Sequence, residues 1–401
     1  MIDSSWRDTP RRFCTSKYIE VVMKSSCSRA LLLCGLFCVS CDSGPDDDAS
    51  SGSETETDGL TGALDADSEA DSAAEPGSPV LVAPQESASP GYPAWADHDL
   101  PDPFAIVASN GYNVFGTTCG LSRICYYQGA TAKTYNAQLT QKPNPMPTAP
   151  PWVNTQDWAL WAPSVVKVGS TYVMYFAGTS WANNNAKCIG LAKSFDGVDG
   201  PYQPEPKPLV CDSTYWNIDP SPVVSGGKRY LVWRSDDAAH VTGKIVAQEM
   251  NATGTGFVGS RVTLLTGAYA WEDDAANASK GLGPLENPSM HVFGGKHILV
   301  YSANNWKTAN YAMGIATCSG PLGPCTKNAT TQPWLNKSWT SPFIETTSTF
   351  VGAGGGELFE NGDGKLYLVF HAYHSTGSTA GPRVPWVYRV ALGFGYNLVQ
   401  I

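Results

Sequence analysis

The chain has 401 residues, including 40 Gly, 29 Pro, 13 Trp and 18 Tyr, and only 15% of it is charged. This composition is typical of many short strands joined by turns, and no long stretch places apolar residues at helical spacing. The formal net charge of −10 comes from one acidic segment, so the rest of the chain is close to neutral and lacks the basic field that nucleic-acid binding needs.

Residues 1–41 predict an export signal. Basic residues precede an apolar run, residues 30–39, that is too short to span a bilayer. The run resembles a bacterial lipoprotein leader, which implies cleavage before Cys41, lipidation of that cysteine and a membrane anchor; the leucine usual three positions earlier is Cys38 here. An ordinary secretory signal cut near the same place is the alternative. Either the first methionine or Met23 could be the start.

Residues 42–90 predict a disordered tether. Between residues 42 and 87 there are 13 Asp or Glu, with no Lys, no Arg and no aromatic residue. Such a segment cannot bury enough apolar surface to fold, and its charges repel one another. An acidic tail that binds a partner is the alternative.

Residues 91–401 contain one pattern five times: a strand, a glycine turn and a second strand. The copies begin PDPFAIVASN at Pro101, APSVVKVGST at Ala162, DPSPVVSGGK at Asp219, ENPSMHVFGG at Glu286 and GELFENGDGK at Gly356. The prolines at 103, 163, 220 and 288 are 60, 57 and 68 residues apart. Paired strands at such a period predict an all-β fold, a five-bladed β-propeller.

Three carboxylates stand at the start of these patterns, Asp102, Asp219 and Glu286. The first strand of a propeller blade lies nearest the axis, so these side chains should converge at one end of the channel. Converging like charges raise one another's pKa and are costly unless a reaction or ligand uses them. An aspartate before proline is also a common turn residue, which is the structural alternative for Asp102 and Asp219.

The chain from Pro101 onward resembles glycoside hydrolase family 43, the arabinanases, α-L-arabinofuranosidases and β-xylosidases. The resemblance is carried by DPF at Asp102, LWAPSV around Trp161, NIDPS around Asp219 and LENPS around Glu286. It implies that Asp102 is the general base, Glu286 the general acid and Asp219 the residue that tunes and orients that acid. Since the third and fourth blades are neighbours, Asp219 should lie beside Glu286 and Asp102 across the funnel, as an inverting glycosidase requires.

Other site residues are expected around these three. Aromatic faces bind sugar rings, so Phe104, Trp161, Trp181 and Trp216 are candidate subsite walls, with blade packing as the alternative for each. Asn287 stands where many relatives have glycine and is expected to contact the substrate.

Two further residues could take part at the fifth blade. The resemblance places His371 on the axis near a hydrated calcium in some members, although no cofactor is required; a hydrogen-bonded histidine without metal is the alternative. Glu357 is a competing carboxylate, interpreted as a solvated or blade-closing side chain.

Six cysteines remain after the leader, and they fall in local pairs. An even number in an exported domain predicts disulfides, and no CxxC spacing indicates zinc. The expected pairs are Cys119 with Cys125, Cys188 with Cys211, and Cys318 with Cys325.

The sequence therefore predicts an exported or envelope-anchored monomer that hydrolyses an oligo- or polysaccharide. A non-catalytic glycan-binding propeller is the alternative, but binding alone needs no complete carboxylate set. A related β-fructosidase would carry an NDPNG motif and a Glu-Cys dipeptide, and neither occurs. The resemblance favours arabinose-containing plant polysaccharides over xylose-containing ones, and the sequence does not distinguish exo from endo action.

Overall fold

The computed structural model describes residues 98–129, 139–182, 185–236, 243–273, 284–327, 342–374, 379–392 and 398–400. The predicted leader with Cys41 and Met23, the tether over residues 42–90 and the first residues of the predicted domain lie outside this part. Within it, no helix is long and apolar enough to cross a membrane.

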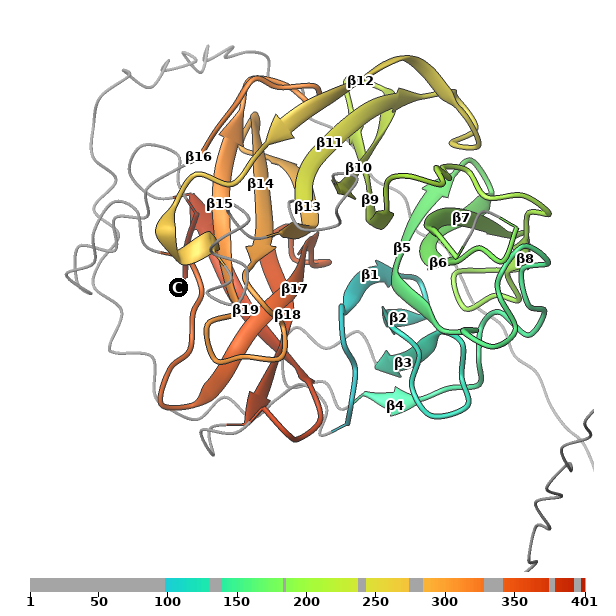
Figure 1. Cartoon of the computed structure of the whole chain (residues 1–401), viewed down its shortest axis with the longest axis horizontal. Helices are drawn as coiled ribbons and strands as arrows, with labels where there is room; N and C mark the ends of the chain where they lie inside the picture. Colours follow the sequence, from blue (N-terminus) through green and yellow to red (C-terminus); the bar gives the residue numbers. More distant parts are fainter. Residues whose placement is uncertain are drawn as a thin grey trace, which may run out of the picture. The chain divides into compact units, whose positions relative to one another are not determined.

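The described residues form five four-stranded antiparallel sheets, which confirms the predicted five-bladed propeller (Figure 1). Chain order equals strand order within every blade. The strands are β1 (Phe104–Ala108), β2 (Gly111–Gly116), β3 (Cys125–Gly129) and β4 (Thr140–Gln141); β5 (Leu160–Val168), β6 (Thr171–Thr179), β7 (Lys187–Ser194) and β8 (Gln203–Pro204); β9 (Asn217–Ser225), β10 (Lys228–Asp236), β11 (Gly243–Met250) and β12 (Phe257–Leu265); β13 (Leu285–Phe293), β14 (Lys296–Ala303), β15 (Ala312–Cys318) and β16 (Cys325–Lys327); β17 (Phe350–Glu360), β18 (Leu366–His374), β19 (Val384–Leu392) and β20 (Leu398–Gln400). The helix among them is a single 3₁₀ turn, η1 (Ala270–Glu272).

The first strand of each blade lies at the axis. Strand β9 contacts β5 and β13, β17 contacts β13 and β1, and β1 contacts β5, so the five inner strands close a ring. The ring is joined by the residues before β1, where the Leu100 N–H donates to the Arg383 carbonyl at 2.9 Å and the Arg383 N–H donates to Asp99 Oδ1 at 2.9 Å. Blade 5 is thus built from C-terminal strands alone and is closed by hydrogen bonds to the start of the domain.

The core is divided among the blade interfaces. Five clusters of buried apolar side chains each join second and third strands of adjacent blades, as Phe115 of β2 does with Phe176 of β6, or Tyr175 of β6 with Trp233 of β10. A fully buried side chain of this size contributes roughly 1.5–3 kcal/mol. Packing between blades therefore fixes the ring, and the ring fixes where the inner strands begin.

The recurring proline marks a bulge in the inner strands. The residue before it has positive φ in four blades, Asp102 at 51°, Ala162 at 43°, Asp219 at 56° and Asn287 at 43°, and Gly355 takes that place in blade 5 at 60°. The pairing register shifts at this point in β5, β9, β13 and β17. Since proline has no N–H for the ladder, it suits a bulge, and bulges re-aim side chains near active sites.

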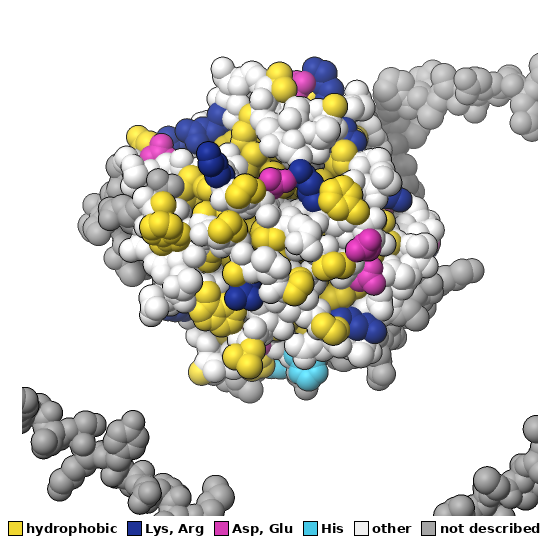
Figure 2. All heavy atoms as spheres, turned by 90° about the vertical axis from the view of Figure 1, so that its right-hand side faces the viewer, with side chains coloured by type: hydrophobic (Ala, Val, Ile, Leu, Met, Phe, Trp, Pro, Cys, Tyr) yellow, Lys and Arg dark blue, Asp and Glu magenta, His cyan; other side chains and the backbone are white. Residues whose placement is uncertain are grey.

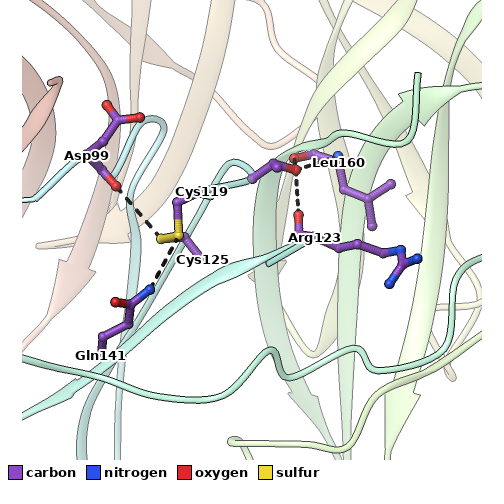
Figure 3. Close-up of a disulfide and its surroundings, with 7 residues drawn as sticks. Asp99, Cys119, Arg123, Cys125, Gln141 and Leu160 are labelled. Carbon is purple, nitrogen blue, oxygen red and sulfur yellow. Dashed lines mark hydrogen bonds between the residues drawn. A yellow bond between two sulfur atoms is a disulfide. The ribbon is translucent and has the colours of Figure 1, made fainter. Parts of the chain in front are cut away.

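All three predicted disulfides are present, joining Cys119 to Cys125, Cys188 to Cys211 and Cys318 to Cys325. The first closes the loop between β2 and β3, which also holds the start of β5 (Figure 3). In that loop the Thr118 hydroxyl lies 2.7 Å from the Arg123 carbonyl and 3.0 Å from the Leu160 carbonyl.

The surface drawn in Figure 2 mixes acidic and basic side chains, with hydrophobic ones scattered among polar ones. This is ordinary solvated surface for a globular domain.

Candidate active site

The positive-φ positions of the five blades bring side chains to one cavity on the axis. Its lining includes Asp102, Asp219, Asn287, Gly355 and Glu357. Positive φ is unusual for a residue with a Cβ, and Asp and Asn tolerate it better than most. At Gly355 the glycine is required by space as well, because a Cβ there would lie 2.5 Å from the His371 ring and 2.7 Å from Asp102 Oδ1.

Asp102 is held by neutral donors. The Thr117 hydroxyl donates to Oδ2 at 2.6 Å, and the Asn287 amide donates to Oδ1 at 3.4 Å. Thr117 Oγ1 in turn accepts the Ala162 N–H at 3.0 Å, which leaves the hydroxyl proton for Asp102. The Asp102 side chain is 15% exposed, so a water molecule can reach it.

Asp219 is buried beside the fourth blade. Its Oδ2 accepts the backbone N–H of Asn287 at 3.0 Å, which fixes it against the bulge of β13. Burial raises its pKa well above the usual range, with the charges of Glu286 and Asp102 acting in the same direction and Arg234 opposing them.

Glu286 is also buried, at 8% exposure, and is paired with a cation. Nη1 of Arg234 donates to its Oε2. Burial raises the pKa of Glu286, while the Arg234 charge and a hydrogen bond from Tyr311 oppose that rise. The charge of Glu286 is one of the causes that raise the pKa of Asp219, so the protonation of one carboxyl affects the other.

The three carboxylates do not occupy equivalent positions, which corrects the register expected from sequence. Asp102 and Asp219 are the positive-φ residues before the recurring proline in their blades, but in blade 4 that place is taken by Asn287 and Glu286 precedes it. Glu286 pairs with Ser302 of β14 just before the register shift. The sequence held the signal, because in LENPS the residue before the proline is the asparagine.

Comparison of the sequence with known protein families identifies the family of this chain. The family described as Glycosyl hydrolases family 43 matches residues 96–391. The chain belongs to this family. None of the curated proteins matches it.

Solved structures share the fold at low sequence identity. A thermostable family-43 glycoside hydrolase superposes with a TM-score of 0.62 at 20% identity, covering 75% of this chain and 92% of that one. An endo-1,4-beta-xylanase from Bacteroides thetaiotaomicron gives 0.60 at 22% identity, covering 76% and 94%. The native arabinanase of Bacillus subtilis gives 0.55 at 19% identity, covering 76% and 99%.

His371 of β18 lies beside Asp102 and Gly355, and its hydrogen bonding does not fit a direct metal ligand. Nδ1 accepts the backbone N–H of Asp102 at 3.0 Å. A backbone N–H can only donate, and burial lowers the pKa of His371 well below its usual value, so the neutral ring carries its proton on Nε2. Neither nitrogen then offers a lone pair to a cation. Within the described ranges, no group of three His, Cys, Asp or Glu side chains forms a metal site.

Two of the expected aromatic walls lie together. Nζ of Lys187 lies 4.8 Å from the ring centre of Trp161 and 5.6 Å from that of Trp216. The ammonium is held there by Asp157 at 2.9 Å and by Thr179 at 2.6 Å. One face of each ring therefore meets Lys187, and a sugar would have to use the other.

The other two expected walls differ in exposure. Phe104 lines the axial cavity but is only 8% exposed and packs in the core between blades 1 and 2. Trp181 is 63% exposed, and its Nε1 donates to the Pro151 carbonyl at 3.2 Å. Asn287, expected as a substrate contact, links Asp102 and Asp219 and accepts the Tyr311 hydroxyl at 3.2 Å.

Glu357 is not a solvated side chain, contrary to the sequence-based interpretation. It lines the axial cavity and takes a hydrogen bond from the Ser221 hydroxyl at 3.2 Å. Burial raises its pKa to about 8, with the hydrogen bonds from Ser289 and Ser221 opposing the rise. Its strand position aligns with Ser164, Ser221 and Ser289, two residues beyond the bulge, so it belongs to a layer below the three candidate carboxylates.

Sequence reasoning missed Thr117, Arg234 and Tyr311. Arg234 had a signal, since a lone arginine in the apolar run YLVWRSD of β10 has to be buried with a partner. Thr117 follows β2 and reaches Asp102 within blade 1, and Tyr311 precedes β15 and reaches Asn287 within blade 4; neither position carried a signal in the sequence.

Proposed function

We propose that this family-43 glycosyl hydrolase is an exported, inverting enzyme that cleaves arabinose- or xylose-containing plant polysaccharides, with arabinanase or α-L-arabinofuranosidase activity favoured. The observation that carries the proposal is the unequal treatment of Asp102 and Glu286. Asp102 is held by the neutral donors Thr117 and Asn287, whereas Glu286 is paired with the Arg234 cation and has a pKa raised by burial.

These surroundings suit two halves of one displacement. Glu286 protonates the glycosidic oxygen as its bond to the anomeric carbon breaks, while Asp102 takes a proton from the water whose oxygen bonds to that carbon from the opposite face. The products are a sugar of inverted configuration and a free hydroxyl on the leaving part. Asp219, fixed by the Asn287 N–H, helps keep the proton on Glu286 through charge repulsion.

The preference for arabinose rests on likeness. Structures with this fold include an exo-1,5-alpha-L-arabinanase from a bovine ruminal metagenomic library and the Bacillus subtilis arabinanase, beside xylan-active proteins. Product analysis on linear arabinan, arabinoxylan and aryl glycosides of both sugars tests it. We expect arabinose or arabino-oligosaccharides as products, and NMR during the reaction should show that the inverted anomer appears first. If the protein bound glycan but released no sugar, it would instead be a non-catalytic glycan-binding propeller.

Export and anchoring are proposed from the leader and supported by the three disulfides. The mature protein should partition with membranes, and Cys41→Ser should release or mislocalise it. Recovery of unmodified wild-type protein entirely in the soluble exported fraction would contradict the lipid anchor.

A further inference from the structure

Arg234 is a buried cation that joins two blades at the candidate general acid. It lies on β10 of blade 3 and is 7% exposed. Its Nε donates to Asp236 Oδ1 at 2.6 Å, its Nη2 donates to Asp236 Oδ2 at 3.0 Å, and its Nη1 reaches Glu286 Oε2 on β13 of blade 4.

We propose that Arg234 is the positioning residue of the general acid: held by Asp236, it fixes which oxygen of Glu286 carries the proton and sets the pH range over which that proton is kept. This inference rests on the proposed hydrolase function and adds a residue to its machinery.

The orientation follows from donor and acceptor chemistry. A bidentate contact with Asp236 locks the plane of the guanidinium, so Nη1 points to Glu286 in one direction. A guanidinium cannot accept a hydrogen bond, and Oε2 is therefore the accepting oxygen of Glu286. When the carboxyl is protonated, its proton lies on Oε1. The proton is thus presented from one defined oxygen, which general-acid catalysis requires.

The charged groups around Glu286 determine how readily it ionises. Cationic Arg234 favours its ionised form, and the carboxylates around it favour the neutral form. The titratable or charged groups that face it from neighbouring elements are Arg234 and Asp236 of β10, Asp219 of β9, Asp102 before β1 and Tyr311 before β15. Removing Arg234 and removing the charge of Asp236 should therefore shift the titration of Glu286 in opposite directions.

A purely structural role is the competing explanation, because a buried carboxylate needs a partner whether or not it reacts. Such a role predicts a loss of folded protein, or a uniform loss of activity, on removing Arg234. It predicts no dependence on the leaving group and no opposite pH shifts.

The experiment compares Arg234→Met, Arg234→Lys and Asp236→Asn with wild type, using Lys228→Met as the matched control. Lys228 is a cation at the other end of β10 and pairs with Glu249 on the surface. Thermal melting establishes that each variant folds. The pH dependence of kcat/KM is measured on an aryl glycoside with a good leaving group and on a natural oligosaccharide.

For Arg234→Met we expect the alkaline limb to move up by about one pH unit and kcat on the oligosaccharide to fall about ten- to a hundredfold, with a smaller fall on the aryl glycoside. Asp236→Asn should move the alkaline limb down. Arg234→Lys keeps the positive charge but loses the bidentate guanidinium contact with Asp236. The alkaline limb of its pH profile should therefore stay near that of wild type, while kcat on the oligosaccharide falls.

Equal losses on both substrates with an unmoved alkaline limb would overturn the inference. If Arg234→Met does not fold, Asp236→Asn and Arg234→Lys decide: an unmoved limb in Asp236→Asn, or full oligosaccharide activity in Arg234→Lys, would overturn it. A wild-type protein that hydrolyses neither substrate would overturn the proposed function instead.

Discussion

Asp102, on the blade-1 side of the funnel, accepts hydrogen bonds from the Thr117 hydroxyl and the Asn287 amide, whereas Glu286, on the blade-4 side, is buried and paired with the Arg234 guanidinium. Both side chains sit at the start of a blade, and both belong to the same repeated pattern. Their surroundings differ because the positive-φ residue before the proline is the carboxylate itself in blade 1 and the neighbouring Asn287 in blade 4.

This difference suits the two different roles proposed for Asp102 and Glu286. A general base has to meet water and take up a proton, which suits a partly exposed carboxylate with neutral partners. A general acid has to keep its proton near neutral pH, which suits a buried one with other carboxylates nearby. A one-residue offset at the bulge of β13 separates the two environments.

The largest effect is expected for Asp102→Ala. Loss of the base should lower kcat by about 10²- to 10⁴-fold on every substrate, because water needs deprotonation whatever leaves. Added azide should restore part of the rate, since it attacks without losing a proton. Asp196→Ala, an exposed aspartate in the turn after β7, is the control and should match wild type. Activity of Asp102→Ala near the wild-type level would remove Asp102 from the mechanism.

Two of the disulfides should also differ in effect, one acting on stability alone and the other on stability and activity. Removing Cys188–Cys211, with a sequence separation of 23, should lower the free energy of unfolding by about 3 kcal/mol, and removing Cys119–Cys125, with a separation of 6, by about 2 kcal/mol. The second loop begins beside Thr117, so its loss should also lower kcat equally on all substrates. Denaturant unfolding and steady-state kinetics of both double serine variants check this. An unchanged kcat without the Cys119–Cys125 disulfide would show that this disulfide does not help to position Asp102.

Glu357 is a half-buried carboxylate outside the proposed acid and base pair. Its pKa of about 8 lies above that of an unfolded glutamate, so the folded protein binds an extra proton between roughly pH 4.5 and 8. Stability from this group is complete below that window and falls as pH rises through it, by at most about 1.4 kcal/mol per pH unit. Glu357→Gln should flatten the fall. Unfolding curves across the window measure it, and an unchanged slope would mean that Glu357 ionises normally.

The smallest effect is expected for Asp219→Asn. Removing the charge beside Glu286 should lower the pKa of the acid, because less repulsion opposes its ionisation. The alkaline limb of the kcat/KM profile should move to lower pH while weak activity remains. A limb that stayed in place, or moved upward, would show that Asp219 does not act on the acid through its charge.

Much of this arrangement could be predicted from sequence. The five copies of the strand–turn–strand pattern predicted five blades, and strand order within a blade predicted that Asp102, Asp219 and Glu286 lie at one end of the axis. Local cysteine spacing gave the three disulfides. Each of these depends on residues close in sequence or on a repeated pattern.

The rest depends on contacts across the ring. Arg234 meets Glu286 from the neighbouring blade, His371 meets the backbone of Asp102 where the ring closes, and Glu357 accepts a hydrogen bond from Ser221 of another blade. No periodicity relates such residues, because each contact is set by how the blades pack. The one-residue offset of Glu286 was readable in the sequence and was missed.

The central claim, that Glu286 is the acid and Asp102 the base, is tested most directly by comparing Glu286→Ala and Asp102→Ala over aryl glycosides of graded leaving-group pKa and a natural glycan. For Glu286→Ala we expect a loss of about 10²- to 10⁴-fold on the natural glycan that shrinks steadily as the leaving group improves. For Asp102→Ala we expect the loss to stay the same across the series. If Asp102→Ala were the variant spared by good leaving groups, with Glu286→Ala inactive on all of them, the two assignments would be reversed and the account contradicted.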